Sequence, residues 1–212
     1  MPKEHKVKQG DCISSISYEH GFFPETLWND PANAQLKKIR KDPNILIPGD
    51  VVVIPDKRLK EIGASSSARH RFKKKGVPEK FRLKLLRDGK PRVSVAFRLD
   101  IDGALKIGQT NGCGMIETVI PPNAKKGLLI VTEEGQEDEE YELNLGYLDP
   151  ITEISGVQMR LHNLEYYCGD MDGILNQATR EAIVEFQRRN GLNPSGQLDE
   201  ITLQKLEEIH GS

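Results

Sequence analysis

The spacing of apolar residues changes twice along the chain, and each change predicts a new structural unit. In residues 1–57 two short strand candidates enclose segments with helical spacing. From Phe81 apolar and polar residues alternate, and from Ile154 helical spacing returns. Small residues followed by a basic run give residues 58–76 the composition of a linker. The pattern predicts a multidomain α+β protein with units at residues 1–57, 77–149 and 150–212.

The first unit is predicted to follow a β-α-α-β order. Strand candidates at residues 5–7 and 51–54 enclose one helix at residues 13–20 and a second at residues 24–29. Gly21 is a typical residue just past a helix, and Pro24 is typical of a first helical turn. Asp11 is the expected N-cap of the first helix, because its carboxylate can accept hydrogen bonds from first-turn amides. Trp28 is expected in the core.

The middle unit is predicted to be a small β-sandwich. Its strand positions alternate between apolar and polar residues, and Asp88-Gly89 and Asp102-Gly103 mark turns. Further turn signals at residues 111–112, 121–123 and 127 delimit three more strands. The acidic run at residues 133–140 is predicted to be a solvated loop. The alternating apolar residues are Phe81, Leu83 and Leu85, followed by Val93, Val95, Phe97, Leu99 and Ile101.

The third unit is predicted to be a bundle of three short helices. Three apolar stripes recur at helical spacing, and turns at Asp172-Gly173 and at residues 191–196 separate them. The stripes are Val157, Leu161 and Leu164; Ala182, Ile183 and Phe186; and Leu203, Leu206 and Ile209.

Charge and composition exclude some partners. The formal net charge of −2 disfavours a nucleic-acid-binding protein, which is usually strongly basic. No apolar segment reaches the length of about 18 residues that a membrane span needs, and the first residues lack the apolar core of a signal peptide. We therefore expect synthesis in the cytoplasm without a signal peptide. Three widely spaced cysteines, Cys12, Cys113 and Cys168, are expected to be reduced thiols.

Motif residues in the first unit point to a known carbohydrate-binding family. Val7, Gly10-Asp11, the helix with Ile13 and Ile16, Leu27-Trp28-Asn29, Leu46, Pro48-Gly49-Asp50 and Val52/Ile54-Pro55 together resemble a LysM domain. The resemblance implies a groove for N-acetylglucosamine chains between the loop after the first strand and the loop before the last. It places Gly10, Asp11, Cys12 and Ile13 on one rim, and Asn44, Ile45, Leu46 and Pro48 on the other. Two departures touch this groove: Cys12 replaces the usual Thr or Ser, and residues 30–43 form a longer connection than usual.

The third unit carries the more specific motif. Residues 156–192, followed by Gly196, Leu198, Asp199, Thr202 and Leu206, resemble the three-helix peptidoglycan-binding domain often fused to wall amidases. Glu165 and Asn176 replace usual glycines, and Asn176 is expected to accept a left-handed backbone.

Sugar binding needs flat aromatic faces and hydrogen-bonding groups, so Tyr166, Tyr167 and Asp172 are the candidate ligand-binding residues of the third unit. In an alternative interpretation one tyrosine only fills the helix junction. Asp172 is favoured as a turn residue over a metal ligand.

Catalytic chemistry is not expected. Peptidoglycan hydrolysis needs paired carboxylates, a zinc site or an activated Cys beside a His, and the sequence has no HExxH motif. The histidines are expected to be scattered, and no catalytic residue, metal or cofactor is assigned. The Cys12/His20 and His162/Cys168 pairs are the nearest alternatives for a catalytic pair.

Two functions remain open. The leading expectation is a non-catalytic protein whose two modules bind peptidoglycan or another N-acetylglucosamine-containing glycan, with avidity from their linkage. The pattern from Asp102-Gly103 through Gly108, Thr110 and Gly112 resembles transthyretin-like β-sandwiches, which occur on type VI secretion spikes, and LysM-like modules occur in phage-tail baseplates. The alternative is therefore a component, adaptor or cargo of a contractile injection machine, with spike or baseplate proteins as partners. Such a machine would deliver the protein to the periplasm or to a target cell.

Overall fold

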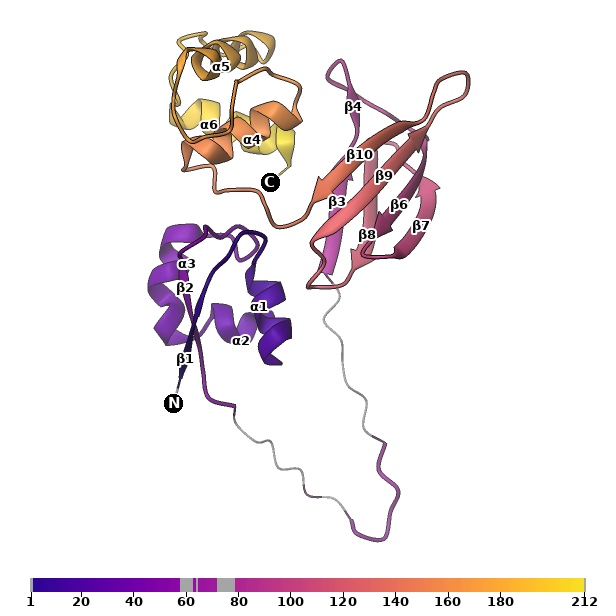
Figure 1. The fold of residues 1–212 in the computed structure, drawn as a ribbon, viewed down its shortest axis with the longest axis vertical. Helices are drawn as coiled ribbons and strands as arrows, with labels where there is room; N and C mark the ends of the chain where they lie inside the picture. The colour runs from indigo at the N-terminus through magenta and orange to yellow at the C-terminus, as the bar shows by residue number, and fades with distance from the viewer. Residues whose placement is uncertain (1, 58–62, 64, 72–78, 212) are drawn as a thin grey trace.

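The described residues bury their apolar side chains in three separate clusters, and we call the parts of the chain around them the N-terminal, middle and C-terminal units (Figure 1). The computed structural model describes residues 2–57, 63, 65–71 and 79–211, so most of the linker predicted at residues 58–76 lies outside the described residues. Several antiparallel sheets and separate helices confirm the mixed α+β class. None of the helices in the described part of the chain is long and apolar enough to cross a membrane.

The N-terminal unit pairs two short strands and covers them with helices. Its elements are β1 (Lys3–Lys6), α1 (Ile13–His20), α2 (Pro24–Trp28), the 3-10 helix η1 (Pro31–Asn33), α3 (Ala34–Arg40) and β2 (Val51–Ile54). Strand β1 runs antiparallel to β2. The predicted bounds of α1 and β2 are confirmed, and Trp28 lies in the core.

The predicted β-α-α-β order is wrong, because the connection at residues 30–43 contains α3. Apolar packing and hydrogen bonds hold this extra segment against the core. Leu36 of α3 is buried in the apolar cluster. The buried Asn33 side chain donates hydrogen bonds to the carbonyls of Leu27 and Val53 and accepts one from the Val53 amide. The connection is therefore an integral part of the unit.

The predicted N-cap of α1 is also wrong, because Cys12 holds that position. Its Sγ accepts a hydrogen bond from the Ser15 amide at 3.5 Å, and Ser15 Oγ accepts one from the Cys12 amide at 3.0 Å. A turn closed by the Asp11 amide and the Lys8 carbonyl places Asp11 before the helix. The Asp11 carboxylate instead accepts a hydrogen bond from the Lys8 amide.

The middle unit consists of antiparallel strands around one core. Its strands are β3 (Glu79–Lys84), β4 (Leu86–Arg87), β5 (Lys90–Pro91), β6 (Ala96–Ile101), β7 (Ala104–Gln109), β8 (Met115–Ile120), β9 (Lys126–Thr132) and β10 (Glu139–Asn144). A four-stranded sheet has the order β10-β9-β6-β7, while β3 pairs with β8 and β4 with β5. Phe81 and Ile116 of the β3–β8 pair share a core with Leu99 and Leu129 of the larger sheet.

Two strand predictions need correction. The strand expected from Val93 begins only at Ala96, because the positive φ of 56° at Ser94 interrupts the extended backbone. Four strands follow Asp102-Gly103 instead of three, since β10 begins inside the acidic run.

The acidic run is not simply a solvated loop, because two of its carboxylates bind arginines of the β4–β5 hairpin. Arg92, only 7% exposed, donates from Nε to Glu133 at 2.9 Å and from Nη1 to Glu139 at 2.6 Å. Arg87 pairs with the same two glutamates. The hydrogen bond from Arg92 lowers the pKa of Glu133, and hydrogen bonds from Tyr141 and Arg92 lower that of Glu139. These two carboxylates therefore stay ionised and tie the hairpins together.

The C-terminal unit contains α4 (Ile154–Asn163), α5 (Gln177–Arg189) and α6 (Glu200–His210). All three predicted apolar stripes contribute to its core or pack against it. Glu165 has the positive φ of 65° that favours glycine. The prediction of a left-handed backbone at Asn176 is wrong. With φ at −81° and ψ at −178°, Asn176 is extended and caps α5 by accepting a hydrogen bond from the Thr179 amide.

Candidate functional site

The α4–α5 loop, residues 164–176, is held in place by a buried glutamine. Gln158 of α4 is fully buried. Its Nε2 donates to the Ile174 carbonyl at 3.1 Å and to Thr179 Oγ1 at 3.0 Å, while its Oε1 accepts from the Gly173 amide at 2.9 Å. One amide side chain therefore fixes the end of the loop against the start of α5.

The same arrangement recurs between α5 and α6. Gln187 of α5 is also fully buried. It donates to the Gln197 carbonyl at 2.9 Å and to Thr202 Oγ1 at 3.0 Å, and accepts from the Gly196 amide at 2.9 Å. Sequence reasoning missed both glutamines. The available signal was the repeated order of a Gln, then a Gly, then a Thr six residues after the Gly.

The two candidate tyrosines of the α4–α5 loop lie in different environments. Tyr166 packs edge-on against Phe186, with ring centroids 5.6 Å apart, and the Arg189 guanidinium lies 5.5 Å from its ring centre. Tyr167 is 85% exposed. Tyr166 therefore matches the alternative in which one tyrosine fills the helix junction. Tyr167 is the tyrosine whose aromatic face is exposed to solvent.

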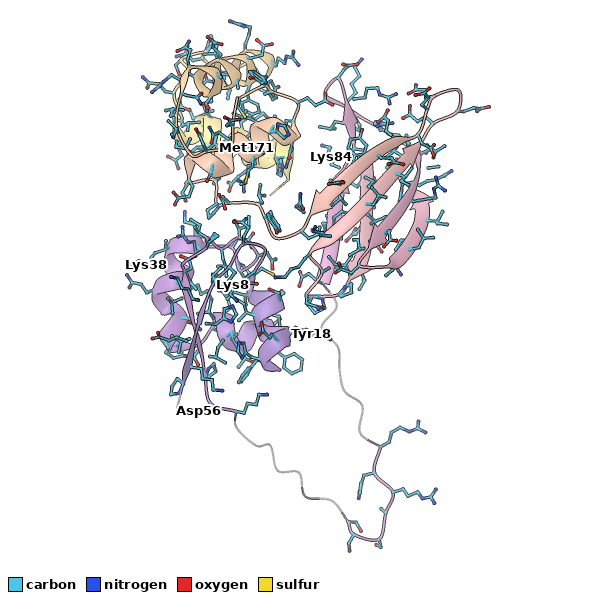
Figure 2. The ribbon with its side chains drawn as sticks, in the orientation of Figure 1. Lys8, Tyr18, Lys38, Asp56, Lys84 and Met171 are labelled. Carbon is cyan, nitrogen blue, oxygen red and sulfur yellow. The ribbon has the colours of Figure 1, made fainter. Side chains whose placement is uncertain are left out.

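Other side chains of the loop extend this surface. Met171 and Ile174 are 44% and 62% exposed, and Met171 lies on the C-terminal unit in Figure 2. Asp172, in contrast, is engaged by its own turn, since it accepts hydrogen bonds from the Ile174 amide and from Gln158. The Ile174 hydrogen bond lowers the pKa of Asp172. The loop therefore presents an apolar and aromatic surface whose shape Asp172 and Gln158 maintain.

The structure brings together the two chain segments that carry the predicted rims of the N-terminal unit. The Ile13 amide donates to the Pro43 carbonyl at 2.9 Å, and Ser14 Oγ donates to Asn44 Oδ1 at 3.4 Å. Ile13 and Leu46 are core residues, so their side chains face away from any groove. Asn44 and Pro48 are exposed, and Cys12 and Ile45 are half-buried.

Part of the first rim is covered by the chain that leaves β10. A Cβ added at Gly146 would lie 2.9 Å from the Gly10 carbonyl oxygen, so glycine permits this close approach of two backbones. Gln9 donates a hydrogen bond to the Tyr147 carbonyl at 3.2 Å. Lys125 of the middle unit lies 3.3 Å from the Asp11 carboxylate. Gly10 and Asp11 therefore take part in contacts between units.

The histidines are not all scattered, and this expectation is wrong for two of them. His5 Nδ1 and His20 Nε2 lie 3.3 Å apart, and His5 Nε2 lies 3.1 Å from Asp11 Oδ2. His5 is on β1 and His20 ends α1, so only the fold brings them together. Hydrogen bonds from Lys8, His5 and Lys125 lower the pKa of Asp11 although burial, the largest single influence, raises it.

Two surface hollows formed by described residues lie away from the predicted binding residues. One lies on the four-stranded sheet, where Asp100, Lys126 and Glu142 are among its lining residues. Another is lined by Pro2, Asp30 and Val53, among others. Neither contains a predicted binding residue. The candidate site is therefore the α4–α5 loop with its exposed Tyr167, Met171 and Ile174, rather than either of these hollows.

Comparison with known proteins identifies the class of the C-terminal unit. Residues 144–206 match the family model of a peptidoglycan binding domain. The match covers α4, α5, the loop between them with Tyr167, and most of α6. The chain therefore contains a C-terminal peptidoglycan-binding domain. No curated protein and no solved structure matches the chain.

Proposed function

We propose that the protein is a non-catalytic cell-wall-binding protein that holds peptidoglycan through its C-terminal domain. The family match over residues 144–206 carries this proposal. The exposed ring of Tyr167 supplies a flat face for a pyranose ring of an N-acetylglucosamine-containing glycan. The N-terminal unit is a second, weaker wall-recognition module, and linkage of the two units raises avidity.

The state of two thiols supports a non-catalytic role. Burial raises the pKa of Cys12 and that of Cys168, which keeps both thiols protonated at neutral pH and poorly nucleophilic. The hydrogen bonds described for the two sulfur atoms involve Ser15, Gln158 and Gly169, and none involves a histidine. Neither Cys12/His20 nor His162/Cys168 therefore has the contact that a nucleophile and its base need.

One observation favours a second candidate function. The rim residues Gly10 and Asp11 contact residues of the middle unit and the segment after it, which is the behaviour of a protein-docking surface. A component, adaptor or cargo of a contractile injection machine would use the modules in this way. Such a machine would also deliver a protein made in the cytoplasm to the periplasm or to a target cell.

Co-sedimentation tests the leading proposal. Purified full-length protein at low micromolar concentration and low salt should pellet with insoluble peptidoglycan and remain in solution with cellulose. The peptidoglycan should release no soluble muropeptides during the incubation. Protein that stays in the supernatant with peptidoglycan contradicts wall binding. Released fragments that disappear in Cys12→Ser or Cys168→Ser contradict the non-catalytic role.

A further inference from the structure

Three side chains with metal-binding atoms meet at one corner of the N-terminal unit. One ligand atom from each of His5, Glu19 and His20 lies within 4.8 Å of the other two. The imidazole rings of His5 and His20 stand edge to face, with an interplanar angle of 86°. Strand β1 supplies the first residue, and the last turn of α1 supplies the other two.

The spacing of the two imidazole nitrogens fits a tetrahedral metal. Zinc–nitrogen bonds of about 2.0–2.1 Å at the tetrahedral angle place two ligand nitrogens roughly 3.3–3.4 Å apart. His5 Nδ1 and His20 Nε2 are already 3.3 Å apart. Both histidines are half-buried and Glu19 is exposed, so the corner is open to solvent on the Glu19 side. Water can therefore supply a fourth ligand.

The carboxylate of Asp11 orients the first histidine for this role. Asp11 Oδ2 lies 3.1 Å from His5 Nε2 and 3.0 Å from the Lys8 amide. Lys125 lies 3.3 Å from the other oxygen, Oδ1. A carboxylate that accepts the Nε2 proton of an imidazole leaves the lone pair on Nδ1, the atom that faces His20. This arrangement of carboxylate, histidine and metal is the usual one around ligating histidines.

We propose that His5, His20 and Glu19 form a Zn²⁺-binding site in which Asp11 is a positioning residue. Both imidazoles bind as neutral rings: His5 keeps its proton on Nε2 and His20 carries its proton on Nδ1. Two imidazoles and one carboxylate suit Zn²⁺, whereas Mg²⁺ prefers ligand sets made of oxygen. The metal fastens β1 to the end of α1, beside the Asp11–Lys125 contact with the middle unit. This inference is independent of wall binding.

Metal titration tests the site. Untagged full-length protein, stripped with a chelator and dialysed, should bind one equivalent of Zn²⁺ in calorimetry and show no binding of Mg²⁺. His20→Gln and Glu19→Gln should each weaken Zn²⁺ binding at least tenfold. Asp11→Asn, which leaves the three ligands in place, should weaken it about 10- to 100-fold. Long-range ¹H–¹⁵N spectra should show Zn²⁺ shifting the ring nitrogens of His5 and His20.

Matched controls separate this site from other metal-binding groups. His162→Gln removes an exposed histidine of α4, and Cys113→Ser removes an exposed thiol. Both variants should bind Zn²⁺ as the wild type does. Circular dichroism must show that each ligand variant is folded, and the exposed position of Glu19 makes Glu19→Gln the safest of them. Absence of Zn²⁺ binding by the wild type overturns the proposal, as does unchanged affinity in folded His20→Gln and Glu19→Gln.

Discussion

Tyr166 and Tyr167 are neighbours in the chain, but Tyr166 packs in the fold whereas Tyr167 is the proposed ligand contact. Tyr166 contacts Phe186 and Arg189 of α5, so its ring contributes to the fold of the C-terminal domain. Tyr167 has no comparable cover, and 85% of its surface is exposed. An exposed aromatic face on a peptidoglycan-binding domain is a natural surface for a sugar ring, because pyranose rings stack on aromatic side chains.

We therefore predict that Tyr167→Ala weakens retention on peptidoglycan and leaves stability unchanged. The lost contact is worth on the order of 1 kcal/mol, or about a fivefold loss of affinity. Tyr166→Ala should instead destabilise the domain by about 2–3 kcal/mol, because it leaves a cavity beside Phe186. Sedimentation and thermal denaturation measure the two effects. Unchanged binding by Tyr167→Ala would remove this residue from the site, and Tyr166→Phe is the control that keeps the packing.

At the scale of elements, α4 and α5 end in the same way with different residues. After α4, the Tyr166 amide donates to the Leu161 carbonyl at 2.9 Å, and the Glu165 amide donates to the His162 carbonyl at 3.0 Å. After α5, the Leu192 amide donates a hydrogen bond to the Gln187 carbonyl at 2.8 Å. Both are Schellman motifs, which require a left-handed residue just past the helix. Gly191 fills this position after α5 with φ at 70°, and Glu165 fills it after α4 with φ at 65°.

Glu165→Gly is predicted to stabilise the protein by about 0.5–1 kcal/mol. A residue with a Cβ is sterically strained in the left-handed region, so replacing it by glycine relieves that strain. The greater flexibility of glycine in the unfolded chain offsets part of this stabilisation. The matched change Gly191→Glu should destabilise by roughly 1 kcal/mol for the same reason. Denaturant unfolding of both variants measures the effect. A destabilised Glu165→Gly variant would mean that the Glu165 side chain makes a compensating contact.

At the scale of the whole molecule, the segment after β10 connects all three units. It carries Gly146 and Tyr147 against the N-terminal unit and continues into α4. Glu153, at the start of α4, lies 3.5 Å from Arg40 of α3. The N-terminal and C-terminal units consequently lie on the same side of the β-rich unit (Figure 1).

Wall binding is predicted to reside mainly in the C-terminal domain. A fragment from Asp149 to Ser212 should keep most of the retention on peptidoglycan, because it contains the helical core and the α4–α5 loop. A fragment from Met1 to Asp56 should keep little, since Cys12 and α3 depart from the LysM pattern at the expected groove. Sedimentation of both fragments, with circular dichroism as the folding control, measures the division. An N-terminal fragment that binds as well as the whole chain would show that these departures are harmless.

The sequence by itself determined the features that depend on near neighbours in the chain. Apolar periodicity located α1, β2 and the three stripes of the C-terminal core, because burial of one face imposes the period of the element. Gly21 marked the end of α1, where a φ of 72° suits a residue without a side chain. The peptidoglycan-binding motif could be recognised in the sequence for the same reason, because its turn and cap residues occur at fixed spacings along the chain.

Tertiary structure alone decided which distant polar groups meet. His5 and His20 become neighbours only when β1 and α1 fold together, and Arg92 reaches Glu133 only when two hairpins pack. The fold likewise covers Tyr166 and exposes Tyr167, although the two residues are adjacent in the sequence. Such contacts depend on the direction in which each element crosses the core. The secondary-structure propensity of a segment does not specify that direction. This is why the sequence indicated the peptidoglycan-binding domain, whereas the structure was required to distinguish Tyr166 from Tyr167 and to find the cluster of His5, Glu19 and His20.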